Sequence, residues 1–202
     1  MKNVKIHVFF VPLIQEIPSG ILLDIKNEKR RREVITGEYL LQYALKELYG
    51  IKLADVRRDK TGKGKPYLSD HPNIHYNISH SGDYVACAIG SQPVGMDIQQ
   101  HRPADLAKLA RQTLSKEEYE IWKQAQDPVS QFYDFWVKKE SYLKWTGDGI
   151  TKDLCSLKMQ GAASVLPVPE GYSGALWTQQ KIPVQCIWLK TEDLLLQEKG
   201  LL

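Results

Sequence analysis

The chain has 202 residues, of which 43% are hydrophobic and 25% are charged. This length suits one ordinary domain or two small domains packed together, and the composition excludes disordered and fibrous classes. The longest apolar stretch near the start, residues 8–14, is interrupted by Pro12 and is far shorter than the roughly 20 residues of a membrane helix. We therefore expect no membrane span and, without a secretory signal pattern, a cytoplasmic protein.

The net charge of +3 is unevenly distributed. Residues 26–65 contain twelve Lys or Arg and six Asp or Glu, so the front of the chain attracts anions. Such a field suits a nucleic acid, an anionic cofactor or an acidic partner protein. Because no nucleic-acid recognition motif accompanies the charge, an anionic small ligand is the simplest interpretation.

The first half of the chain is predicted to contain a strand, a helix and a group of strands. Alternation predicts a strand over residues 4–12, and apolar spacing near 3.6 predicts a helix over 32–48 that ends before Gly50. Residues 61–70 are rich in Gly, Lys and Pro, which is typical of a loop open to a ligand. Three short strands, expected to form an antiparallel meander, follow at 73–78, 84–89 and 93–98.

The second half begins with two helical stretches. One covers residues 104–125 with a second start at Ser115, whose partner Glu118 would complete a capping box, and the other runs from Ser130 to Gly147. β-like runs follow at 154–159, 175–178 and 184–190. The pattern predicts an α/β (α+β) fold of two similar halves, residues 1–100 and 101–202, joined near Gln100–Pro103.

Two pairs of residues could carry chemistry. Asp97 and Gln99 flank Ile98 on a predicted strand, so both side chains share one face and could present oxygen ligands to one ion. Glu140 and Lys144 are four residues apart on a predicted helix and also share a face. The plainer alternatives are a strand-end aspartate in a turn and an exposed helical ion pair.

His80 lies between Ser79 and Ser81, where an imidazole and backbone amides in a small polar loop could meet phosphate oxygens. The plainer alternative is a solvent-facing histidine. Lys63 and Lys65 lie among glycines, but Pro66 stands where a phosphate-binding P-loop needs Ser or Thr.

Serine-hydrolase, dinucleotide-binding and paired-cysteine zinc motifs are absent from the sequence. Cys87, Cys155 and Cys186 are widely spaced among mostly apolar neighbours. That spacing favours buried, reduced thiols over a disulfide framework or a zinc site.

Four blocks occur in a fixed order: Gly64–Tyr67, Asn77–Ser81, Gly95–Ile98 and Trp136–Lys144. Together they resemble the signature of 4′-phosphopantetheinyl transferases of the Sfp type, and Trp-x-x-Lys-Glu-x-x-x-Lys in the last block is the most specific part. The match is dense over residues 64–144. The resemblance implies a pseudo-twofold fold of two α/β halves with the active site at their interface.

The resemblance also implies transfer of the phosphopantetheine arm of coenzyme A to a serine of an acyl or peptidyl carrier protein, with release of 3′,5′-ADP. It implies Mg²⁺, with Mn²⁺ as an alternative, and a monomer that binds neither nucleic acid nor membrane. The implied metal ligands are Asp97, Glu140 and Gln99, and the implied catalytic residues are Glu140, Lys144 and Asp97. The implied contacts to coenzyme A are Lys65, Pro66, Ser79, His80, Lys144 and Arg31. Of these, Arg31 belongs to the Lys29–Arg32 cluster. Glu140 is the expected acceptor of the serine proton, and Glu118 is a weaker candidate.

One position departs from the family pattern, which usually reads Asp-x-Glu where this chain has Asp97-Ile98-Gln99. A neutral amide can still offer a carbonyl oxygen, so we expect weakened or altered metal binding rather than an inactive site. Two alternatives stay open: a coenzyme A or nucleotide-binding module that has lost catalysis, and a protein-interaction domain steered by anions. The retained Asp97, Glu140 and Lys144 favour an active enzyme.

Overall fold

The computed structural model describes residues 5–17, 24–149 and 153–195. Its elements are β1 (Ile6–Pro12), α1 (Glu28–Tyr49), a 3₁₀ turn (Leu53–Asp55), β2 (Arg58–Lys60), β3 (Pro66–Leu68), β4 (His75–Ser81), β5 (Tyr84–Gly90), β6 (Gly95–Gln100), α2 (Leu106–Thr113), α3 (Lys116–Lys123), α4 (Pro128–Thr146), β7 (Ala162–Val165), β8 (Tyr172–Thr178), β9 (Val184–Trp188) and α5 (Thr191–Leu195).

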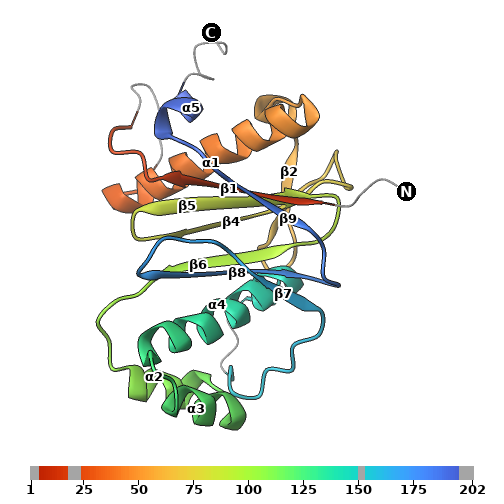
Figure 1. The fold of residues 1–202 in the computed structure, drawn as a ribbon. Helices are drawn as coiled ribbons and strands as arrows, with labels where there is room; N and C mark the ends of the chain where they lie inside the picture. Colours follow the sequence, from red (N-terminus) through yellow and green to blue (C-terminus); the bar gives the residue numbers. More distant parts are fainter. Residues whose placement is uncertain (1–4, 18–23, 150–152, 196–202) are drawn as a thin grey trace.

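Two sheets lie face to face between two layers of helices (Figure 1). The first sheet has the order β4-β5-β1-β9 and the second the order β6-β8-β7, while β2 and β3 form a separate hairpin. Helix α1 covers the outer face of the first sheet, and α4 covers the outer face of the second, with α2 and α3 beyond it (Figure 1). This arrangement agrees with the predicted α+β fold of two halves.

Strand β1 shows why the layers form. Its apolar side chains alternate, so Val8 and Phe10 pack into the core between the sheets, while Phe9 and Val11 pack into the core beneath α1. All four are almost completely buried. A strand that is apolar on both faces requires cover on both sides, which the second sheet and α1 provide.

The two sheets also meet along their edges. Three side chains of β4 accept hydrogen bonds from alternate backbone N–H groups of β6, and the acceptor–donor pairs are Asn77–Met96 at 2.8 Å, Ser79–Ile98 at 3.2 Å and Ser81–Gln100 at 3.0 Å. We call this row the seam. It joins the sheets through side chains where no backbone ladder is formed between β4 and β6.

The predicted meander is wrong for its last strand. β6 pairs antiparallel with β8 instead of β5, and β9 returns to pair parallel with β1. The physical reason is that both edges of β5 are already paired, with β4 on one side and β1 on the other, so β6 has no free edge of β5 to join. The predicted halves are residues 1–100 and 101–202. Each sheet contains one strand from the other half, because β9 lies in the first sheet and β6 lies in the second.

Other boundaries differ from expectation for local reasons. Helix α1 begins at Glu28 instead of residue 32, because Asn27 caps it by accepting a hydrogen bond from the backbone N–H of Arg30. Ser79 and His80 lie in strand β4 rather than in a loop. Residues 154–159 do not form a strand; the third strand of the second sheet is β7.

The three cysteines are free thiols, as expected, but only Cys87 is fully buried. Burial raises the pKa of the Cys87 and Cys186 thiols. Among the helices in the described ranges, none combines the length and the apolar character that crossing a membrane requires.

Helix α4 is held in place by a buried ion pair. Lys139 is only 1% exposed, and its Nζ lies 2.8 Å from Oε2 of Glu118 and donates to the Leu154 carbonyl at 2.9 Å. Glu118 also completes the predicted capping box with Ser115 at the start of α3. The pair therefore ties α3 and the segment after α4 to the helix that carries Glu140.

We predict that Glu118→Gln lowers the free energy of unfolding by about 3 kcal/mol, because it leaves the buried Lys139 charge without its partner. Glutamine keeps the capping interaction at this position, so the loss reports the ion pair. Denaturant unfolding measures it. The matched control is Glu120→Gln, which removes the exposed pair with Lys123 and should change stability by less than about 0.5 kcal/mol. Equal small changes in both variants would contradict the prediction.

Candidate active site

The site lies where the seam meets α4. Asp97 is 5% exposed and faces α4, while Ile98 points into the core between the sheets, as strand alternation predicts. A close approach makes this possible: a Cβ at Gly95 would lie 2.1 Å from the Ser141 carbonyl oxygen. Only glycine therefore allows the start of β6 to lie against the backbone of α4.

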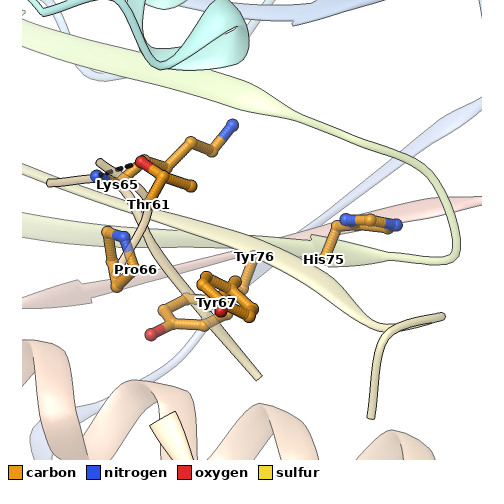
Figure 2. A pocket seen from close by; sticks show the side chains of 6 residues that line it. All are labelled: Thr61, Lys65, Pro66, Tyr67, His75 and Tyr76. Atoms are coloured by element: carbon orange, nitrogen blue, oxygen red, sulfur yellow. Dashed lines mark hydrogen bonds between the residues drawn. The ribbon is translucent and has the colours of Figure 1, made fainter. Parts of the chain in front are cut away.

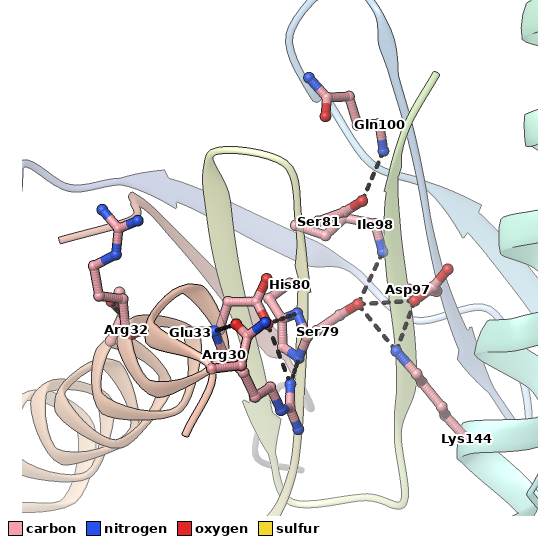
Figure 3. Close-up of polar contacts among 12 residues, drawn as sticks. Arg30, Arg32, Glu33, Ser79, His80, Ser81, Asp97, Ile98, Gln100 and Lys144 are labelled. Atoms are coloured by element: carbon pink, nitrogen blue, oxygen red, sulfur yellow. Dashed lines mark hydrogen bonds and ion pairs between the residues drawn. The ribbon is translucent and has the colours of Figure 1, made fainter. Parts of the chain in front are cut away.

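A partly exposed cation, a buried carboxylate and a buried hydroxyl form the centre of the site (Figure 3). Nζ of Lys144 lies 2.6 Å from Oδ1 of Asp97, and Oγ of Ser79 donates to the same oxygen at 2.8 Å. Lys144 also donates to Ser79 at 3.0 Å. The two faces predicted from spacing, that of Asp97 and that of Lys144, therefore meet.

Two carboxylate oxygens in this centre are buried without a hydrogen-bond partner among the described residues: Oδ2 of Asp97 and Oε1 of Glu140. Burial raises the pKa of Glu140, and the negative charge of Asp97 raises it further, while Lys144 opposes the shift. Unpaired carboxylate oxygens that repel one another are suited to a hard cation such as Mg²⁺, which commonly takes one or two protein carboxylates. Asp97 and Glu140 therefore fit the expected metal.

The third expected ligand lies in a different environment. Gln99 lines a pocket of about 290 Å³ whose other walls are Leu109, Phe132, Tyr133 and Trp136. Within residues 5–17, 24–149 and 153–195, no group of three or more His, Cys, Asp or Glu side chains is arranged to hold a metal. The role of Gln99 as a ligand stays a prediction.

His80 is held by the first turns of α1. Its Nδ1 lies 3.2 Å from Oε2 of Glu33, and its Nε2 contacts a guanidinium nitrogen of Arg30 (Figure 3). Burial lowers the pKa of His80, and the charges of Arg30 and Lys144 add to this, while Glu33 opposes it. A neutral imidazole that donates to Glu33 and accepts from Arg30 satisfies both contacts.

Arg30 opens onto a pocket of about 720 Å³. The other lining residues are Glu38, Arg58, Asp59, Lys60, Gly64, Pro66, Tyr76 and Ile78. Glu38 is engaged by Arg58, whose Nη1 lies 2.8 and 2.7 Å from its two carboxylate oxygens. The pocket thus contains three cationic and two anionic side chains, and it has room for an anionic ligand of nucleotide size.

Lys65 is placed differently from the expectation. Its Nζ donates to the backbone carbonyls of Val94 and Trp145, both at 3.0 Å, and burial lowers its pKa to about 8. Nearby, Lys63 pairs with Asp148 just beyond α4. Lys65 lines a smaller pocket of about 180 Å³, with Thr61, Pro66, Tyr67, His75 and Tyr76 (Figure 2). Its amine thus links the loop before β3 to the end of α4.

The structure brings Asp97, Glu140, Lys144 and Ser79 together and places His80 beside them. Pro66 borders the larger pocket, whereas Arg31 is not among the described residues that line it. The sequence reasoning did not single out Arg30 or Glu33. Arg30 belongs to the Lys29–Arg32 cluster and Glu33 follows it directly, but their approach to His80 depends on where helix α1 begins.

Comparison with known proteins agrees with these observations. The model of the 4′-phosphopantetheinyl transferase N-terminal region matches residues 9–92, and that of the 4′-phosphopantetheinyl transferase superfamily matches residues 93–182. The chain is 32% identical to the 4′-phosphopantetheinyl transferase Sfp of Bacillus subtilis over 179 residues, which cover 80% of this chain and 79% of that protein. The chain belongs to the Sfp-type 4′-phosphopantetheinyl transferases.

Two further relatives support the membership in this family. The 4′-phosphopantetheinyl transferase HetI of Nostoc is 34% identical over 170 residues, which cover 73% of this chain and 71% of HetI. The 4′-phosphopantetheinyl transferase psf-1 of Bacillus pumilus is 35% identical over 127 residues, which cover 62% of this chain and about half of psf-1, 54%. The two family models meet between residues 92 and 93, just before β6, so β6 falls within the match to the superfamily model.

Folding raises the pKa of the Glu140 carboxyl above its ordinary value of 4.5. The native state therefore loses stability as the pH rises from 4.5 through this raised pKa. Glutamine carries no charge at any pH. We therefore predict that Glu140→Gln is more stable than the metal-free wild type at pH 7, and that the difference disappears below about pH 4.

Urea unfolding in the presence of a chelator, at several pH values, measures this difference. The exposed Glu120→Gln variant should show no such trend. A Glu140→Gln variant less stable than wild type at pH 7 would show that Glu140 makes a net favourable contribution without metal.

Proposed function

We propose that this protein transfers 4′-phosphopantetheine from coenzyme A to a serine hydroxyl of an acyl or peptidyl carrier protein, with Mg²⁺ or Mn²⁺ as the required ion. The observation that carries the proposal is the pair of buried oxygens of Asp97 and Glu140, which have no hydrogen-bond partner among the described residues and lie beside the Lys144 ammonium. Both halves of one chain supply the site, which supports a monomer. A cytoplasmic location is part of the same proposal.

The larger pocket is the proposed site for the nucleotide end of coenzyme A. Arg30 lines this pocket and also contacts His80, so His80 can hold the guanidinium in place to meet the 3′-phosphate. The apolar pocket beside Gln99 is the proposed site for the pantetheine arm, because it lies on the same face of β6 as Asp97 and is lined by aromatic side chains. The pyrophosphate would then lie between the pockets, near Lys144.

In the proposed reaction the serine oxygen forms a bond to the phosphorus that carries pantetheine. The bond from that phosphorus to the bridging oxygen breaks, and its electron pair leaves with 3′,5′-ADP. Glu140 accepts the serine proton, for which its raised pKa suits it. Lys144 holds the pyrophosphate by charge, and Asp97 keeps its carboxylate directed at the ion. Asp97 and Glu140 would hold Mg²⁺, which when bound would neutralise the charge that grows on the phosphoryl oxygens.

The deciding experiment is mass spectrometry of a carrier protein incubated with this protein, coenzyme A and Mg²⁺. We expect the carrier to gain the mass of phosphopantetheine on one serine. Glu140→Gln should reduce the rate by about 100-fold or more, because it loses both a metal ligand and the proton acceptor. A wild-type protein that modifies no carrier but binds coenzyme A would favour the binding module over the enzyme.

We expect Arg30→Ala to weaken coenzyme A roughly ten- to a hundred-fold while weakening dephospho-coenzyme A much less, because a charge-assisted hydrogen bond to the 3′-phosphate is lost. Calorimetry with both ligands measures the difference. Arg31→Ala is the matched control, and its effect should be small. If the selective loss follows Arg31 instead, then the contact implied by the family resemblance is the correct one.

Gln99→Glu should lower the Mg²⁺ concentration that gives half-maximal transfer without raising maximal turnover. An added carboxylate on the face of Asp97 binds a hard cation more tightly, but it also adds negative charge beside the pyrophosphate. A Mg²⁺ titration of the transfer rate at fixed coenzyme A measures both quantities. An unchanged half-saturation point would place residue 99 outside the metal shell.

A further inference from the structure

The Ser79 hydroxyl has no hydrogen-bonding capacity left for a ligand. A serine hydroxyl offers one donor and two acceptor sites. Oγ of Ser79 donates to Oδ1 of Asp97 at 2.8 Å and accepts from the Ile98 N–H at 3.2 Å and from Lys144 at 3.0 Å. Because Ser79 is only 3% exposed, these three partners account for its whole hydrogen-bonding inventory.

These contacts control which oxygen of Asp97 is available. The hydroxyl and the Lys144 ammonium both bind Oδ1, whereas Oδ2 is buried without a partner among the described residues. A carboxylate held through one oxygen cannot rotate without breaking that bond. The other oxygen, Oδ2, is therefore kept in a fixed position within the centre.

Ser79 differs in this respect from the other residues of the seam. Asn77 and Ser81 accept a β6 N–H in the same way, but neither has a described contact with Asp97 or Lys144. We infer that Ser79 is a positioning residue for the metal ligand Asp97 rather than a coenzyme A contact through its hydroxyl. This inference rests on the proposed function for the identity of the ion.

The test is a Mn²⁺ titration followed by electron paramagnetic resonance, with coenzyme A present and no carrier protein, so that no turnover occurs. Ser79→Ala should weaken Mn²⁺ about tenfold or more. Ser81→Ala, which removes an equivalent seam bond, should leave Mn²⁺ affinity unchanged. Ser79→Cys fills nearly the same space with a weak donor and should behave like Ser79→Ala, and Ser79→Thr, which keeps the hydroxyl, should restore binding.

Equal Mn²⁺ affinities in the Ser79→Ala and Ser81→Ala variants would overturn the inference, as would absence of Mn²⁺ binding by the wild type. So would a Ser79→Ala protein that binds Mn²⁺ normally but loses affinity for coenzyme A and not for dephospho-coenzyme A, because the hydroxyl would then contact the 3′-phosphate. A wild type that binds Mn²⁺ with the expected variant pattern yet modifies no carrier protein would count against the proposed function alone.

Discussion

The row of hydrogen bonds between β4 and β6 is the constraint on which the site depends. An edge strand must satisfy its backbone N–H groups, and burial makes an unpaired one costly. β4 meets this need with three polar side chains spaced two residues apart, so that every second N–H of the facing strand has a partner. The two sheets are thereby joined along a line at which Ser79 and Asp97 face each other.

The same line concentrates charge in a place where water is largely excluded. Asp97 and Lys144 neutralise each other, but the second carboxylate of the centre, Glu140, lies close enough for Asp97 to raise its pKa. In a protein without a bound cation, this arrangement costs stability. Costs of this kind are typical of active sites, where groups are arranged for the bound ligand rather than for the empty protein. The buried pair of Lys139 with Glu118 holds the same helix and has both of its charges paired, which distinguishes this structural ion pair from the proposed catalytic one.

Local sequence patterns predicted the features that depend only on residues close together in the chain. Alternation placed Asp97 on one face of β6 and Ile98 on the other, helical spacing put Glu140 and Lys144 on one face, and the capping box at Ser115 was recognisable from two residues. These features depend on neighbours within a turn or a strand. The order of motifs also indicated the family, and the comparisons confirmed it.

Long-range pairing was not predictable in the same way. The pairing of β6 with β8 joins residues more than seventy positions apart, and the return of β9 to β1 spans almost the whole chain. Periodicity gives the face of an element but not its partner, so neither could be read from spacing. The same limit applies to Lys65, whose amine is taken by carbonyls at distant positions. It applies to Arg30 as well, because its approach to His80 depends on where the Asn27 cap starts the helix.

Gln99 shows how these two kinds of information combine. On the strand it shares a face with Asp97, which led to its prediction as a metal ligand, yet its surroundings are the aromatic side chains Phe132, Tyr133 and Trp136. A carboxylate buried there would pay a desolvation cost that a neutral amide avoids, unless a cation lay within reach. The neutral amide therefore suits an apolar pocket, but it offers a bound cation one negative charge fewer than a carboxylate would. Under the proposed function, residue 99 sets the balance between the ion and the pantetheine arm, because the strand that carries Asp97 reaches the pocket at this position.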